Sequence, residues 1–84
     1  MKRLSPALCR AGSALIDWTQ DDLAKAAGVG RSTVRDFEKG HHCLQRASEE
    51  AIITALHNSG VEILAEGRGG PGVRLRSADR LPWA

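Results

Sequence analysis

Residues 18–40 read WTQDDLAKAAGVGRSTVRDFEKG, and this stretch decides the fold. Thr19, followed three residues later by Asp22, has the arrangement of a capping box in which Asp replaces the usual Glu. Gly28 supplies the left-handed backbone conformation that commonly ends a helix. The stretch therefore predicts a short helix over residues 20–27.

A second helical pattern follows almost at once, because only Val29 and Gly30 separate it from the first. Residues 31–39 carry two apolar residues, Val34 and Phe37, three positions apart. So narrow an apolar edge leaves most of the helix facing solvent or a ligand. Two helices joined by so short a turn have the spacing of a helix-turn-helix, whose second helix has the right width for the major groove of B-DNA.

Helical patterns also flank this pair of helices. Ser5 followed by Pro6 predicts a helix start, and apolar residues recur at helical spacing over about residues 6–16. On the other side, a loop over residues 41–47 precedes Ser48, which two acidic residues follow. We therefore predict that Ser48 caps a fourth helix.

Beyond residue 60 the period of the pattern changes. Residues 61–66 are β-prone, residues 67–72 are rich in glycine, and residues 73–76 alternate apolar and basic side chains. This order predicts a β-hairpin. A lone two-stranded hairpin is marginal in water, so it must pack on the helices or pair with another copy of the chain.

Composition narrows the classes of function. The chain has 84 residues and a net charge of +2, which fits one globular domain but is too mild to prove a nucleic-acid partner. With two Trp, one Phe and no Tyr, it has few side chains on which single strands could stack, and no apolar run is long enough to cross a membrane. Without a secretory signal, we expect Cys9 and Cys43 to be reduced thiols in a cytoplasm.

Residues 18–40 resemble the Cro/repressor-like (XRE-type) helix-turn-helix family of small bacterial and phage regulators. The resemblance rests on the first helix, the small residues at the turn and the Glu-x-Gly end, at Gln20, Leu23, Ala24, Ala27, Gly28, Val29, Ser32, Val34, Phe37, Glu38 and Gly40. A weaker resemblance covers about residues 5–60. The chain departs from the pattern at Gly30, where the family often has Ser, and in the loop over 41–47, which lacks the frequent Pro.

The resemblance implies a mainly α fold: a four-helix, repressor-like domain over residues 1–60, a C-terminal β-hairpin over 61–76 and a tail over 77–84. It also implies that the start of the recognition helix reads bases and that residues near helix ends hold phosphate. The expected base-reading residues are Arg31, Ser32, Thr33 and Arg35, and the expected phosphate contacts are Gln20, Lys39 and His41. Arginine is the commonest reader of guanine.

These roles describe a transcriptional regulator that binds double-stranded DNA sequence-specifically. One helix reads too few bases for a genome, so we expect a homodimer on a palindromic operator. We expect the hairpin and the fourth helix to build the dimer contact, in which the hairpin contributes its apolar set, Val61, Ile63, Val73 and Leu75. The alternative is a protein–protein module, an antitoxin or antiactivator, which would bind a protein partner with the same fold and for which the tail Leu81-Pro82-Trp83 is a candidate contact.

Other chemistry has weak support. His41, His42 and Cys43, taken with Cys9, lack the spacing of a metal site. Residues 67–72 lack the Gly-Lys-Ser/Thr of a phosphate-binding loop. The sequence has no nucleophile elbow, no paired-acid motif on one predicted face and no cofactor fingerprint. We therefore expect no metal, no cofactor and no enzymatic activity.

The basic residues of the hairpin allow two interpretations. Arg74 and Arg76 fall on one face of the predicted strand, where they could contact the DNA backbone. They could equally be solvated side chains that balance Glu62 and Glu66. The sequence favours neither of these interpretations.

Overall fold

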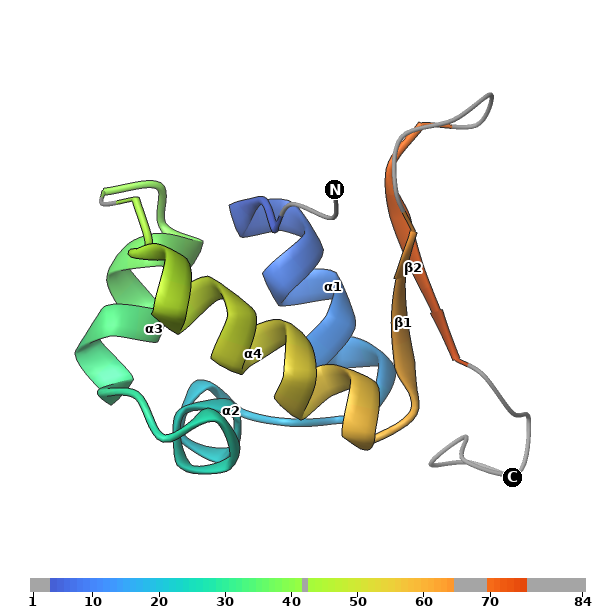
Figure 1. Ribbon diagram of the computed structural model, residues 1–84, viewed down its shortest axis with the longest axis horizontal. Helices are drawn as coiled ribbons and strands as arrows, with labels where there is room; N and C mark the ends of the chain where they lie inside the picture. The colour runs from blue at the N-terminus through green and yellow to red at the C-terminus, as the bar shows by residue number, and fades with distance from the viewer. Residues whose placement is uncertain (1–3, 42, 65–69, 76–84) are drawn as a thin grey trace.

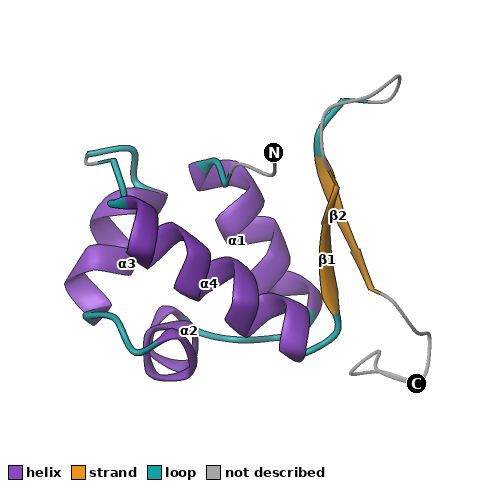
Figure 2. Ribbon diagram, viewed as in Figure 1, coloured by secondary structure: helices purple, strands orange, loops and turns teal. Residues whose placement is uncertain are grey.

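The computed structural model describes residues 4–41, 43–64 and 70–75, and within them the chain forms four helices followed by a two-stranded antiparallel hairpin (Figures 1 and 2). The elements are α1 (Pro6–Leu15), α2 (Gln20–Ala27), α3 (Arg31–Glu38), α4 (Arg46–Asn58), β1 (Val61–Leu64) and β2 (Gly72–Leu75). The predicted fold class, a mainly α helix-turn-helix domain with a C-terminal hairpin, is confirmed. Among these residues, no helix combines the length and the apolar character needed to cross a membrane.

The first two helices begin at the predicted caps. The Ser5 hydroxyl accepts a hydrogen bond from the backbone N–H of Leu8 at 3.1 Å. At the start of α2, the Thr19 hydroxyl accepts from the N–H of Asp22 at 3.1 Å, and the Asp22 carboxylate accepts from the N–H of Thr19 at 2.9 Å. This reciprocal pair satisfies two backbone donors that the helix itself cannot bond. Gly28 then ends α2 with φ +72°, as predicted.

The prediction that Ser48 caps the fourth helix is wrong. The helix α4 already begins at Arg46, after Gln45 in an extended conformation whose side chain makes no capping hydrogen bond. Arg46 and Ala47 both have high helix propensity. Arg46 also pairs with Glu50 one turn later, with Nε and Oε1 3.4 Å apart. These local preferences add about half a turn before the expected cap.

The hairpin has one apolar and one polar face. Directly opposite residues of an antiparallel pair point to the same side. The register therefore puts four apolar residues on one face, with Val61 opposite Leu75 and Ile63 opposite Val73. On the other face Arg74 lies opposite Glu62, and the Arg74 Nη2 and Glu62 Oε1 atoms are 2.9 Å apart. The apolar face packs against α1 and α4.

The helices and the hairpin share a single core among the described residues. Its fully buried side chains come from all four helices and from β1: Cys9, Leu23, Val34, Ile52, Leu56 and Val61. Gly12 lets α1 approach α4 and β1 closely, because a Cβ at this position would lie 3.2 Å from Leu56 Cδ1 and 3.5 Å from Val61 Cγ1. The side chains of β1 therefore belong to the same core as the helices.

The arrangement of the elements separates two surfaces. In Figure 1, α3 lies at one end of the longest axis and the hairpin lies at the other, with α1 and α4 between them. The helix α2 packs against both α3 and α4. A ligand that contacts the exposed side of α3 therefore approaches the molecule at the end opposite the hairpin.

Candidate nucleic-acid interface

The helix α3 is held by its apolar edge and presents its polar residues to solvent. Val34 and Phe37 are buried in the core. The four predicted base-reading residues are all exposed: Arg31, Ser32, Thr33 and Arg35. Two of them, the arginines, are four residues apart and therefore share one face of the helix. All four predicted base readers are thus accessible on α3, and the two arginines share one face of it.

The turn before α3 leaves the start of the helix uncovered. Gly28 has open space around the position of a Cβ, so its requirement is the positive φ and not the lack of a side chain. Gly30 caps α3 with its backbone carbonyl, which accepts from Thr33 N at 3.1 Å and Val34 N at 3.2 Å. Because Gly30 has no side chain, nothing of its own stands between the helix start and an approaching phosphate.

The arginine in the middle of α3 has an acidic neighbour. Arg35 Nε lies 3.4 Å from Asp36 Oδ1, and the Arg35 side chain is 46% exposed. The contact lowers the net positive charge of the base-reading surface. It engages Nε, whereas a bidentate contact to guanine can use the two terminal amino groups of the guanidinium.

Two of the predicted phosphate contacts follow α3 directly. Lys39 and His41 are both exposed, and Gly40 between them has φ +79°, which turns the chain. The backbone N–H of His41 donates to the carbonyl of Asp36 at 2.9 Å and fixes this turn. His42 lies outside the described residues. The two side chains therefore stand beside the end of the candidate recognition helix.

The third predicted phosphate contact, Gln20, is tied to a buried carboxylate. Glu38 is only 7% exposed. Its Oε1 accepts from Gln20 Nε2 at 3.1 Å, and its Oε2 accepts from the Cys9 thiol, with Sγ 3.2 Å away. The Arg10 guanidinium donates to the main-chain carbonyl of Glu38. One residue of α3 thus connects α1, α2 and α3.

This polar cluster was not predicted from the sequence. Arg10 bonds the main chain of Glu38, and the Glu38 carboxylate has two neutral partners, Gln20 and Cys9. The row Cys9, Gly12 and Ser13 on α1 consists of small residues at helical spacing, and this signal could have indicated a close approach by another helix.

The two cysteines differ sharply in environment. Burial, together with the hydrogen bond to Glu38 and its charge, raises the pKa of the Cys9 thiol far above its ordinary value, and Arg10 opposes this only in part. Cys9 therefore stays protonated and can donate. Cys43 is exposed, and both thiols are free. Among the residues that the structure describes, no group of three or more His, Cys, Asp or Glu could hold a metal ion.

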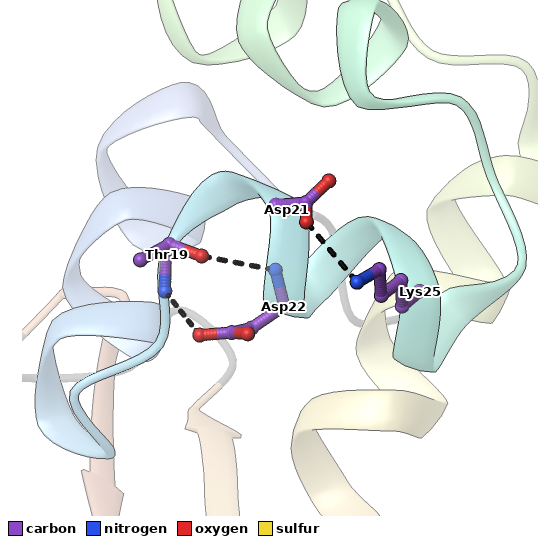
Figure 3. Close-up of polar contacts among 4 residues, drawn as sticks. All are labelled: Thr19, Asp21, Asp22 and Lys25. Atoms are coloured by element: carbon purple, nitrogen blue, oxygen red, sulfur yellow. Dashed lines mark hydrogen bonds and ion pairs between the residues drawn. The ribbon is translucent and has the colours of Figure 1, made fainter.

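The first turn of α2 carries two acids beside Gln20, and Figure 3 shows the partner of each. Asp21 Oδ2 lies 3.3 Å from Lys25 Nζ. Asp22 accepts from Thr19, and the hydrogen bonds from the Thr19 backbone and hydroxyl lower the pKa of the Asp22 carboxyl. Carboxylates repel phosphate, and Lys25 offsets the charge of Asp21 near the candidate phosphate contact, whereas the hydrogen bonds from Thr19 favour the charged form of Asp22.

The predicted dimer residues lie on the inner face of the hairpin. Val61 and Ile63 are buried within the chain, and Val73 and Leu75 are half-buried against the same core. Their side chains therefore already have partners. A second copy could reach the hairpin through its outer face, which carries the Arg74–Glu62 ion pair, or through a strand edge.

A comparison with known families agrees with this geometry. Residues 15–53 match the family model described as Helix-turn-helix, from the end of α1 into α4. No curated protein matches the chain. This segment is therefore a helix-turn-helix domain of the Cro/repressor-like, XRE-type family. The match supports a DNA-binding helix-turn-helix regulator.

Proposed function

We propose that the chain binds double-stranded DNA sequence-specifically by inserting α3 into the major groove. The observation that carries the proposal is the division of α3 between the buried Val34 and Phe37 and the four exposed residues Arg31, Ser32, Thr33 and Arg35. An α-helix with its side chains is about 10–12 Å across, comparable to the width of the groove. Its position at the end opposite the hairpin gives the groove access to it (Figure 1).

In this proposal one set of residues reads base edges and a second set binds phosphate. Arg31 and Arg35 read guanine, while the hydroxyls of Ser32 and Thr33 donate to or accept from neighbouring base edges. The residues that hold phosphate are Gln20, Lys39 and His41. They fix the register of α3 in the groove but carry no sequence information.

The functional unit in this proposal is a homodimer in the cytoplasm of a bacterium, acting on a palindromic operator. Two recognition helices about one turn of DNA apart read enough bases for a genome. Because Val61 and Ile63 fill the core of their own chain, we propose that the hairpin contributes a strand edge to the two-fold contact. A monomeric mass at micromolar protein concentration would contradict the dimer.

The test is a fluorescence-anisotropy titration with the DNA upstream of the protein's own gene, in parallel with a scrambled duplex and over a series of salt concentrations. We expect the upstream duplex to bind about 10³-fold more tightly or better. Equal affinities with a steep salt dependence would mean generic phosphate binding. If the folded protein bound neither duplex, the proposal would fail and the protein-partner alternative would replace it.

An Arg→Ala pair gives this test a matched control. Arg35→Ala should weaken binding to the upstream duplex by about 5- to 150-fold and relax the preference over the scramble, because it removes a candidate base contact. Arg74→Ala, at the opposite end of the molecule, should leave both affinities unchanged. Equal losses for the two variants would contradict the placement of α3 in the groove.

A further inference from the structure

We propose that Glu38 is a positioning residue for the DNA backbone: its buried carboxylate orients the Gln20 amide, and the Cys9 thiol holds that carboxylate in place. This inference rests on the proposed function, because it assigns a cause to the placement of one phosphate contact. Glu38 does not itself reach the DNA in this proposal. It acts through Gln20, which stands at the first position of α2.

The chemistry of the contact fixes the orientation of the amide. A carboxylate oxygen accepts hydrogen bonds, and the amide nitrogen is the single side-chain donor of glutamine. Glu38 Oε1 therefore faces Gln20 Nε2, at 3.1 Å, and excludes the flipped amide. One N–H of Gln20 is directed to Glu38. The second N–H of the same nitrogen is the donor that we assign to a phosphate oxygen.

The carboxylate is itself held from the opposite side. Cys9 Sγ donates to Oε2 at 3.2 Å, so each oxygen of Glu38 has a different helix as partner. The raised pKa of the thiol keeps this donor protonated. Arg10 donates to the Glu38 carbonyl at the end of α3, where a positive charge also suits the helix dipole. Rotation of the carboxylate would therefore break a hydrogen bond in the interior of the protein.

Burial makes this arrangement persistent. Glu38 is 7% exposed. When a buried carboxylate loses a hydrogen-bond donor, nothing offsets its unfavourable free energy of desolvation. Hydrogen bonds are also electrostatically stronger away from water. Gln20 is only partly buried and so remains accessible to a ligand. In this cluster the buried Glu38 carboxylate fixes the Gln20 amide, whose second N–H stays accessible. The Gln20 side chain therefore loses less freedom when DNA binds.

The test is a double-mutant cycle on the full chain, with Gln20→Ala, Glu38→Gln and the double variant titrated against the upstream duplex. Glu38→Gln keeps the shape of the side chain but allows both amide orientations at Gln20. We expect each single variant to weaken binding about threefold to tenfold, the size of one hydrogen bond. The double variant should bind like Gln20→Ala alone, because Glu38 acts through Gln20.

Several outcomes would overturn this inference. If the two losses multiply, or if Glu38→Gln binds like the wild type, Glu38 does not position Gln20. Wild-type protein that binds neither the upstream nor the scrambled duplex would overturn the proposed function, and this inference with it. Wild-type binding combined with independent losses would overturn the inference alone. Thermal unfolding of each variant, followed by circular dichroism, identifies losses that arise from an unfolded fraction.

Cys9 provides a second route to the same answer if Glu38→Gln fails to fold. Cys9→Ser retains a donor to Glu38 Oε2 and should keep the affinity of the wild type. Cys9→Ala removes the donor and should weaken binding about twofold or more, a loss that should disappear in the Gln20→Ala background. Equal affinities of Cys9→Ala and the wild type, or a Cys9→Ala loss that persists without Gln20, would overturn the inference.

Discussion

The α3 end and the hairpin end of the molecule both combine buried apolar residues with arginines, but they arrange them differently. At the α3 end, a narrow apolar edge is buried and exposed arginines extend along the helix, where Arg35 has only a neighbouring carboxylate at 3.4 Å. At the hairpin end, the apolar face closes the core, and Arg74 pairs across the strands with Glu62 at 2.9 Å. Both arginines have a carboxylate partner, but Arg74 pairs across two strands whereas Arg35 pairs with the next residue of its own helix.

The apolar residues differ between the two ends as well. The hairpin carries an apolar face, and such a face can cover either the helices of its own chain or a second copy. In this chain it covers α1 and α4. The hairpin therefore stabilises the domain that presents α3, whatever further contact its edge makes. The predictions below test this division, from the largest expected effect to the smallest.

The largest effect should come from the inner face of the hairpin. Ile63→Ala removes a side chain that is 3% exposed and should lower the free energy of unfolding by about 2–4 kcal/mol. Chemical denaturation followed by circular dichroism measures this loss, with Leu64→Ala on the opposite face as the control, expected below about 1 kcal/mol. An Ile63→Ala variant of unchanged stability that no longer dimerises would place this side chain in the interface instead.

A smaller effect should come from the start of α2. Thr19→Ala removes the hydroxyl half of the capping box and should destabilise the protein by about 1 kcal/mol. Because folding lowers the pKa of Asp22, this group stabilises the fold above its unfolded pKa, about 3.9, and the contribution is lost as the pH falls through the folded pKa. Thr19→Ala keeps the backbone N–H that contributes most to this shift and removes only the hydroxyl contribution, so it should weaken the dependence of stability on acid in part.

Urea denaturation at about pH 7 and about pH 3, on either side of the ordinary Asp pKa, measures both parts of this prediction. Asp21→Asn is the matched control, since its exposed pair with Lys25 should contribute little. An acid dependence that Asp21→Asn reduces as much as Thr19→Ala would show that the capping box is not its source.

The smallest effect should come from the outer face of the hairpin. The Arg74 side chain is 62% exposed, so the loss of its ion pair in Arg74→Ala should change the unfolding free energy by less than about 0.5 kcal/mol. A DNA titration of this variant distinguishes the two interpretations of the hairpin arginines. Weaker binding to every duplex, with the salt slope reduced by about one, would mean that the hairpin contacts the DNA backbone.

Local signals in the sequence predicted most of the fold. Thr19 with Asp22, and Gly28 after them, gave the bounds of α2, and the short turn gave the start of α3. The start of α4 was missed because two good helix formers continue the helix before Ser48. The residue at which a helix begins or ends depends on the helix propensities and capping groups of neighbouring residues.

Long-range pairing could not be predicted in the same way. The contact between Cys9 and Glu38 joins residues 29 positions apart, and nothing local to either side chain specifies the other. Alternation placed Val61 and Ile63 on one face of a strand but could not say what covers that face. The roles of Arg31, Ser32 and Thr33 in reading bases remain predictions, supported by their exposure on α3.

The two thiols differ in exposure, so their labelling rates can report how often the native protein opens. A thiol reagent meets the exposed Cys43 directly, whereas it can reach the buried Cys9 only in the moments when α1 separates from α3. With Cys43 as the reference, the labelling rate of Cys9 reports how often the native chain opens. A ligand that binds α3 only in the closed form should slow the labelling of Cys9. The decrease in rate then measures the fraction of protein that is bound, without a label on the ligand.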